Sequence, residues 1–148
     1  MLRLFIASLL LSTSLSAQEM PANWFSDYAA AQAYAEQHDG SILMVFAGSD
    51  WCRPCIQFKQ DILTSVAFTD FTQGKLAILY LDFPARRKNQ LPAAQTEHNE
   101  ALAARYNPQG SFPKIVLLDT AGRILAEPAF KGQTPEQYME ELTQDLNL

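Results

Sequence analysis

The sequence has few of the residues that bind metals or nucleic acids. It contains two cysteines and two histidines in 148 residues, and a structural zinc site normally takes four such ligands. A zinc site would therefore need all four side chains, although His38 and His98 lie far from the cysteines. Lysine and arginine number 11 against 16 acidic residues, which gives a formal net charge of -5. Nucleic-acid-binding proteins present a basic face to phosphate, so this composition argues against that class.

Repeats and biased segments are also missing. The chain has no collagen-like or coiled-coil pattern and no repeat of about 20–50 residues. Apolar residues make up 48% of the sequence and charged residues 18%, which is typical of a globular protein and not of a disordered one. A chain of this length usually forms one domain, and we expect one here.

The first residues have the layout of a secretory signal peptide. Arg3 supplies a positive charge, Leu4–Leu11 is almost wholly apolar, and small residues lead to Ala17. A membrane-spanning helix needs about 20 apolar residues, so this stretch is too short for one. We therefore expect residues 1–17 to be removed and residues 18–148 to form a periplasmic or secreted domain without stable membrane insertion. An uncleaved amphipathic helix or a short anchor is the alternative.

Three apolar runs predict the central sheet. Ser41–Phe46, Leu76–Leu81 and Lys114–Leu118 are continuous and of strand length, which is typical of strands buried on both faces of a parallel sheet. Asp119–Gly122 predicts a turn, after which Arg123–Ala126 pairs back antiparallel. Helical patterns alternate with these strands, at Tyr28 to Gly40 after a cap at Ser26, Arg53 to Leu63, Val66 to Gln73 (a helix or a loop), Pro92 to Tyr106, and from Thr134 onward with Tyr138, Leu142 and Leu146 on one face.

This order predicts a three-layer α/β/α fold. Its central sheet is expected to be mixed and mostly parallel, with a C-terminal antiparallel hairpin and a final helix. Phe83–Gln90 is a polar loop between a strand and a helix. It contains Arg86, Arg87 and Lys88, which either meet an acidic partner or are simply solvated.

Two cysteines stand at the junction of the first strand and the following helix. At a helix start, the Cys52 sulfur would face unpaired N–H groups and the positive end of the helix, both of which favour the reactive thiolate. Arg53 adds a positive charge, and Pro54 stiffens the first turn. Cys55 follows one turn later and faces inward. This spacing predicts an exposed attacking thiol and a shielded resolving thiol.

Other interpretations of the pair are weaker. A purely structural disulfide would close a very small ring, and disulfide stabilisation grows with loop length. A metal site would need ligands from elsewhere in the chain, and no metal site is predicted. A C-x-x-C pair at a strand-to-helix junction instead indicates a redox dithiol. Trp51 either shields the thiols or simply packs, and Asp50 either tunes the pair or is a plain turn residue. Both histidines are expected at the surface.

Four segments in this order carry a family resemblance. They are Phe46–Cys55 (FAGSDWCRPC), Tyr106–Pro113 (YNPQGSFP), Val116–Arg123 (VLLDTAGR) and Phe130–Gly132 (FKG). Together they resemble the thioredoxin superfamily, from about Ser26 to the C-terminus. The resemblance implies a cis peptide bond between Phe112 and Pro113, placed against the two cysteines. It also implies that this loop offers backbone groups to an extended substrate segment.

The chain departs from the family pattern beneath the cysteines. Cytosolic members carry a buried Asp in the first central strand, where this chain has Val45, and the matching Lys is absent from Leu76–Leu81. Losing both is consistent, because one buried charge alone would be costly, but it leaves open which group accepts the proton of Cys55. Ser111 is an extra residue before the proline and Lys114 replaces the usual Thr, which indicates altered substrate pairing.

The sequence therefore predicts a thiol:disulfide oxidoreductase that reduces protein disulfides outside the cytoplasm. Cys52 would attack a substrate disulfide and Cys55 would resolve the mixed disulfide. No cofactor is needed, and the partners are disulfide- or dithiol-bearing proteins and a membrane or soluble dithiol electron donor. Pro54 before the second cysteine resembles reducing members of the family. The alternatives are an oxidase or isomerase of the same fold, and a non-catalytic binding module with a fixed disulfide. Copper or haem assembly would be a special case of the reductase, and no Met or His cluster supports copper.

Overall fold

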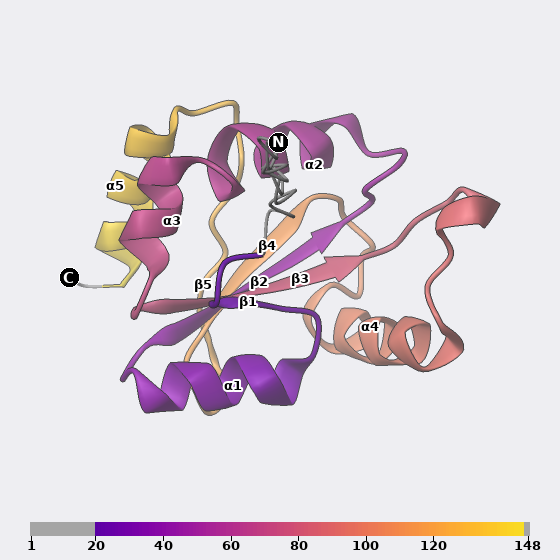
Figure 1. Cartoon of the computed structure of the whole chain (residues 1–148), viewed down its shortest axis with the longest axis horizontal. Helices are drawn as coiled ribbons and strands as arrows, with labels where there is room; N and C mark the ends of the chain where they lie inside the picture. The colour runs from indigo at the N-terminus through magenta and orange to yellow at the C-terminus, as the bar shows by residue number, and fades with distance from the viewer. Residues whose placement is uncertain (1–19, 147–148) are drawn as a thin grey trace, which may run out of the picture.

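The computed structural model describes residues 20–146, so the predicted signal peptide lies outside the described residues (Figure 1). Within this range no helix is long and apolar enough to span a membrane. The elements are, in chain order, β1 (Trp24–Phe25), α1 (Tyr28–Gln37), β2 (Ser41–Ala47), α2 (Arg53–Phe58), the π-helical turn η1 (Lys59–Leu63), α3 (Val66–Thr72), β3 (Leu76–Asp82), the 3-10 turn η2 (Arg87–Asn89), α4 (Ala93–Tyr106), β4 (Lys114–Leu118), β5 (Ile124–Ala126) and α5 (Pro135–Asp145).

The sheet is mixed and has the order β1-β3-β2-β4-β5. β3 runs parallel to both β1 and β2, whereas β4 runs antiparallel to both β2 and β5. The three apolar runs and the final hairpin are confirmed as strands. Parallel pairing is less dominant than expected. The composition of a run buried on both faces does not show whether the strand pairs parallel or antiparallel. β1 was not predicted, since two residues are too short to show a pattern.

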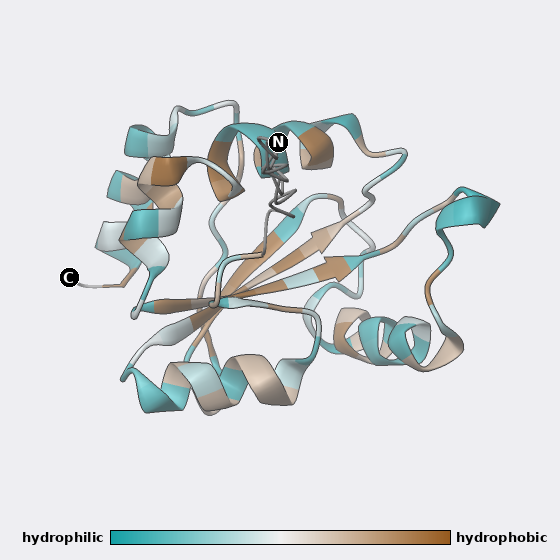
Figure 2. Cartoon of the chain, in the orientation of Figure 1, coloured by the Kyte–Doolittle hydropathy of each residue, from teal (hydrophilic) through white to brown (hydrophobic). Residues whose placement is uncertain are grey.

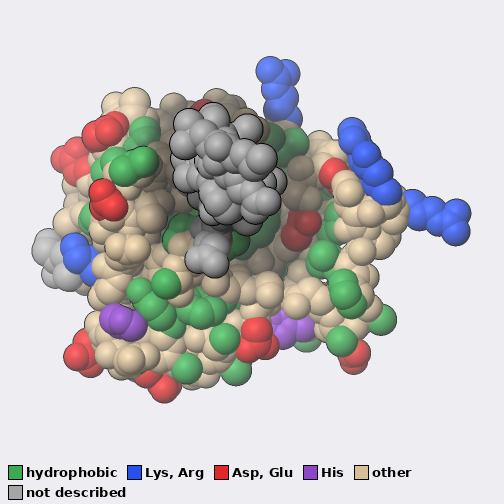
Figure 3. Space-filling view, in the orientation of Figure 1, with side chains coloured by type: hydrophobic (Ala, Val, Ile, Leu, Met, Phe, Trp, Pro, Cys, Tyr) green, Lys and Arg blue, Asp and Glu red, His purple; other side chains and the backbone are tan. Residues whose placement is uncertain are grey.

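Helices cover both faces of the sheet, which confirms the three-layer fold. α2, α3 and α5 pack on one face and α1 and α4 on the other (Figure 1). Alternate β2 residues serve the two cores, with Leu43 and Val45 in the core that includes the cysteines and Met44 and Phe46 in the other. The strands are the most apolar part of the molecule (Figure 2). Many charged side chains lie at the surface (Figure 3).

The helix boundaries agree with the sequence except at a few ends. Asp27 caps α1 in place of Ser26, because its side chain accepts a hydrogen bond from Ala30 N at 2.9 Å. Residues 66–72 form a helix and not a loop. Thr134 begins α5 with a capping box closed by Gln137, in which each side chain bonds the other's backbone N–H.

One of the two histidines differs from its expected surface position. His38 is exposed, as predicted. The His98 side chain is only 25% exposed, because Tyr28 N donates to its Nε2 at 3.1 Å and its Nδ1 lies 3.0 Å from the Asn99 side-chain oxygen. His98 therefore joins α4 to the start of α1, a long-range role that its polar sequence neighbours did not indicate.

Candidate active site

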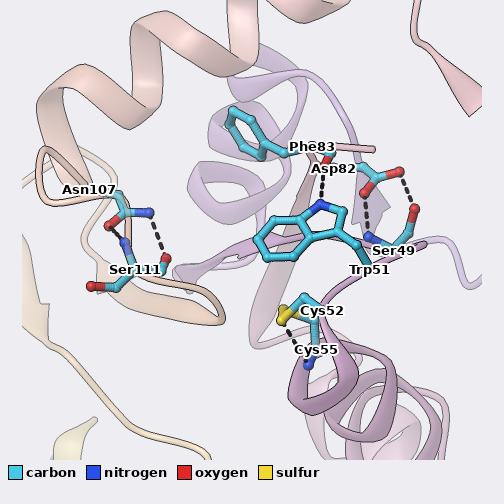
Figure 4. The surroundings of a disulfide bond; sticks show 8 residues. All are labelled: Ser49, Trp51, Cys52, Cys55, Asp82, Phe83, Asn107 and Ser111. Carbon is cyan, nitrogen blue, oxygen red and sulfur yellow. Dashed lines mark hydrogen bonds between the residues drawn. A yellow bond between two sulfur atoms is a disulfide. The ribbon is translucent and has the colours of Figure 1, made fainter. Parts of the chain in front are cut away.

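A disulfide joins the two cysteines at the start of α2, with their Cα atoms 5.2 Å apart (Figure 4). Cys52 is the N-cap of the helix, and its sulfur accepts a hydrogen bond from Cys55 N at 3.3 Å. Pro54 lies in the first turn, where its missing N–H costs no helical hydrogen bond. The predicted placement of the Cys52 sulfur at the N-terminus of a helix is therefore confirmed.

The two cysteines are more alike in burial than the sequence predicts. In the disulfide form Cys52 is 5% exposed and Cys55 is 1% exposed. Cys52 was expected to be exposed, but its sulfur is bonded to that of Cys55 and both residues belong to one apolar cluster, against which Phe112 also packs. Cys52 remains the outer of the two.

An aromatic wall borders the disulfide. Trp51 is 50% exposed and meets Phe112 edge to face, with ring centroids 5.3 Å apart, while Phe112 meets Phe83 at 5.4 Å. The Trp51 indole N–H donates to Phe83 O at 2.7 Å (Figure 4). Gly48 lies under the indole, where a Cβ would overlap the ring atoms. A glycine at this position therefore permits the orientation of Trp51 beside the cysteines.

The Phe112–Pro113 peptide bond is cis, as the resemblance implies. The loop before it is held by Asn107, whose side-chain amide donates to Ser111 O at 2.8 Å and whose oxygen accepts from Ser111 N at 3.0 Å. The extra residue Ser111 is thus accommodated by a side-chain bridge. Asn107 was not singled out from the sequence. Its hydrogen-bond partner is close to it in the chain, but its burial depends on segments that are distant in the chain. Lys114 pairs with Glu127 at 3.0 Å.

Asp82 anchors the turn before the cysteines. It accepts from Ser49 N at 2.9 Å and from the Ser49 hydroxyl at 2.6 Å. Asp82 lies at the end of β3, opposite Ala47 at the end of β2, so parallel pairing brings the two segments together. Asp82 was not predicted as a site residue, although its position directly after an apolar run was a signal.

Asp50 anchors the loop that follows β3. Its carboxylate accepts from Ala85 N at 2.8 Å, from Arg86 N at 2.9 Å and from the Asn89 side chain at 2.9 Å. Burial acts to raise the pKa of Asp50, but these hydrogen bonds and the Arg86 charge outweigh it and hold the pKa below its usual value. Asp50 is therefore more than a plain turn residue, because it joins two separate segments beside the cysteines.

The floor of the site is apolar, as the missing charge pair predicts. Val45 is fully buried, and it shares a core cluster with Cys52, Cys55 and Phe58. Within residues 20–146 no acidic or basic residue is buried, and the buried polar residues are Asn23, Thr72, Asn99 and Asn107. The structure therefore places no carboxylate in the core beneath the disulfide.

An open cavity of about 620 Å³ lies beside the site, between β1, β3 and α4. The Lys59 ammonium lies 4.8 Å from the centroid of the Tyr80 ring in its wall. Burial, with a smaller contribution from the Asp82 charge, raises the pKa of Tyr80 to about 12. Neither cysteine lines this cavity, and the described residues form no cluster of His, Cys, Asp or Glu that could hold a metal.

The chain is similar to known proteins in sequence and in fold. A family model described as a thioredoxin-like domain matches residues 28–147. The disulfide bond reductase DsbH of Chlamydia pneumoniae is 34% identical over 124 residues, which cover 84% of this chain and 73% of DsbH. The thioredoxin-related protein DsbJ of the same organism is 32% identical over 120 residues, 76% of this chain but only 34% of DsbJ. A solved structure described as a DsbH oxidoreductase has a TM-score of 0.78 at 30% identity and covers 96% of each chain.

Proposed function

The chain belongs to the thioredoxin-like family and is a thiol:disulfide oxidoreductase, and from this premise we propose that it reduces protein disulfides outside the cytoplasm. The observation that carries the proposal is the Cys52–Cys55 disulfide at the start of α2. The cis proline Pro113 on a neighbouring loop supports a role in binding an extended substrate. The similarity to a protein named as a disulfide bond reductase supports the direction.

The first step is attack by Cys52. In the reduced protein its thiolate attacks one sulfur of a substrate disulfide and forms a mixed disulfide, while the other substrate sulfur leaves as a thiolate and takes up a proton. The helix N-terminus and the neighbouring Arg53 charge favour the Cys52 thiolate. Trp51 and Phe112 form the aromatic wall that the substrate meets on approach.

The second step is resolution by Cys55. Cys55 gives up its proton and attacks the Cys52 sulfur, so the mixed disulfide breaks, the second substrate sulfur leaves as a thiolate, and the Cys52–Cys55 disulfide forms. Two electrons have then passed from the protein dithiol to the substrate. The disulfide in the structure corresponds to this product state. A protein dithiol, soluble or in a membrane, must reduce it again.

A redox titration tests the proposed direction. After equilibration in thiol buffers of defined potential, the reduced fraction is read from the mass added by alkylation. We expect a midpoint of about -270 mV, in the range of reducing thioredoxins, because the apolar floor gives the reduced form no charge partner at Cys55. A midpoint of about -120 mV, as in strongly oxidising members of the fold, would overturn the reductase. A disulfide that mild dithiols do not reduce would indicate a binding module.

The localisation has its own prediction. We propose that residues 1–17 are a signal peptide, which is supported by the charged, apolar and small-residue pattern of this segment. The first element of the fold begins at Trp24, so cleavage near Ala17 would leave every described element intact. N-terminal sequencing of protein recovered from the cell envelope should begin at or next to Gln18. Protein that keeps Met1 and stays in the cytosol would contradict the proposal.

A further inference from the structure

Four exposed basic side chains lie at the active-site end of the molecule. Arg53 follows Cys52 at the start of α2, and Arg86, Arg87 and Lys88 lie in the loop after β3. We refer to these four residues as the cationic flank. They are four of the 11 lysines and arginines in the chain. Positive charge is therefore concentrated at this end, although the net charge of the chain is negative.

The loop that carries most of the cationic flank is fixed in place beside the cysteines. Asp50, two residues before Cys52, receives the backbone N–H groups of Ala85 and Arg86 and the side chain of Asn89. These bonds use the backbone N–H of Arg86 and not its side chain, and they hold the loop against the active-site turn. The Trp51 indole adds a further bond to this segment, at Phe83 O. The positive charges are therefore positioned next to the disulfide, on a loop that is held by hydrogen bonds.

No flank residue makes an ion pair in the described part of the chain, although the Arg86 charge contributes to the lowered pKa of Asp50. Among residues 20–146 the ion pairs within 4.0 Å are made by His98, Lys114 and Arg123, and none by the flank. The two acids nearest to the flank in sequence accept hydrogen bonds from neutral groups, Asp50 from the loop backbone and Asp82 from Ser49. They offset part of the positive charge but do not pair with the flank side chains. The flank charges are thus available to an external partner.

Negative charge gathers at the opposite end of the molecule. α5 lies far from the loop that carries η2 (Figure 1). Acidic side chains lie over the end that carries α5, and most of the visible Lys and Arg side chains project at the other end, where some acidic side chains are also present (Figure 3). α5 contains four acids and no lysine or arginine, namely Glu136, Glu140, Glu141 and Asp145. Such a charge separation orients an acidic partner toward the cysteines during approach.

We propose that the cationic flank binds an acidic polypeptide segment next to the target disulfide, so that the protein prefers cysteines flanked by Asp and Glu. This inference rests on the proposed function. A substrate strand at the Pro113 loop that continues past the exposed Trp51 would reach the flank, which is anchored to the same turn. A polypeptide is favoured over an anionic membrane, because a membrane bound to this face would cover the cysteines that the substrate must reach.

Two peptides test the preference. Each carries one cysteine as a mixed disulfide with 2-nitro-5-thiobenzoate; one has Asp and Glu around the cysteine and the other has Asn and Gln at the same positions. The absorbance of the released thiolate gives the rate of reduction by the full, reduced chain. We expect the acidic peptide to react about five-fold faster at low salt. The difference should fall below about two-fold in 1 M salt, where the screening length is about 3 Å.

Matched double variants assign the effect to the flank. Arg87→Gln with Lys88→Gln removes two of the four flank charges and should reduce the five-fold preference for the acidic peptide to about two-fold. Lys75→Gln with Arg105→Gln removes the same charge next to the far end of β3 and in the last turn of α4. Each position lies about 20 Å along its element from the flank, by the rise of a seven-residue strand or of a 14-residue helix, and the variant should leave the preference intact.

Several outcomes would overturn the proposal. Equal rates for the two peptides, or an equal loss of preference in the control variant, would show that the flank does not select acidic segments. Equal rates together with flank-dependent sedimentation on phosphatidylglycerol vesicles would assign the flank to a membrane. If the neutral peptide is not reduced at all, the proposed function itself fails, and this inference fails with it.

Discussion

Replacing Cys55 by alanine should stop turnover and leave the substrate attached to Cys52. Attack by Cys52 does not need Cys55, but release of the substrate does, because only Cys55 lies within the same helical turn to break the mixed disulfide. We expect turnover to fall by on the order of 10³-fold or more, as when a catalytic group is removed outright. Non-reducing gels should show higher-mass adducts that disappear with dithiothreitol, and mass spectrometry of these adducts identifies the substrates.

The matched control is Cys52→Ala. It makes the same substitution at the other cysteine of the turn. It should abolish both turnover and trapping, because Cys55 is 1% exposed and does not reach a substrate. Adducts that form through Cys55 in this variant would reverse the two roles. Undiminished turnover in Cys55→Ala would show that the buried cysteine takes no part in the reaction.

Placing an acid at Val45 should cause the largest loss of stability of any single change proposed for this chain. Val45 is fully buried in an apolar cluster without acidic or basic groups, so Val45→Asp leaves a carboxyl unpaired in the core. We expect the free energy of unfolding to fall by about 3 kcal/mol or more at neutral pH. Urea unfolding at several pH values measures the loss.

The pH dependence of that loss has a definite sign. Burial raises the pKa of the introduced carboxyl in the folded state above its unfolded value of about 4. The loss should therefore be smallest below about pH 4, where both states are protonated, and should grow as the pH rises toward the folded-state pKa. Val45→Asn is the control, because it is polar but does not titrate and should show a loss that is independent of pH. A Val45→Asp protein as stable as the original would mean that this position is not in the core.

The same variant tests how Cys55 loses its proton. In the original protein burial disfavours the Cys55 thiolate, so resolution of the mixed disulfide should be slow at neutral pH and faster in alkaline solution. The carboxylate of Val45→Asp lies in the same cluster and should accept this proton, which would speed resolution near neutral pH in single-turnover measurements. If resolution is already fast in the original protein, a group outside the core activates Cys55. A carboxylate supplied by the partner is then the next candidate, since Asp50 is held by the loop after β3.

Local sequence was enough to locate four of the five strands and the cysteine pair. The runs Ser41–Phe46 and Leu76–Leu81 are apolar throughout, and their burial on both faces follows directly from that composition. The position of Cys52 at a helix start followed from the strand before it and the proline after it. The cis bond at Pro113 required the family resemblance, because nothing local demands it.

Contacts between distant segments could not be predicted. Ser49 and Asp82 are 33 residues apart and meet only because β2 and β3 pair in parallel. The three-bond anchor at Asp50 likewise depends on the path of the loop after β3. The cluster that contains Cys52 is also covered by Phe112, which comes from a different loop. Each of these features depends on the assembled sheet and not on a periodic pattern.

The Asn107 bridge makes the position of Pro113 independent of the length of the loop that precedes it. Two hydrogen bonds from one side chain span residues 107 to 111 and add to the backbone bond from Gly110 N to Asn107 O. A loop built in this way can gain or lose a residue between its ends during evolution without displacing the strand that follows. Selection on Asn107 would then act through the placement of Pro113.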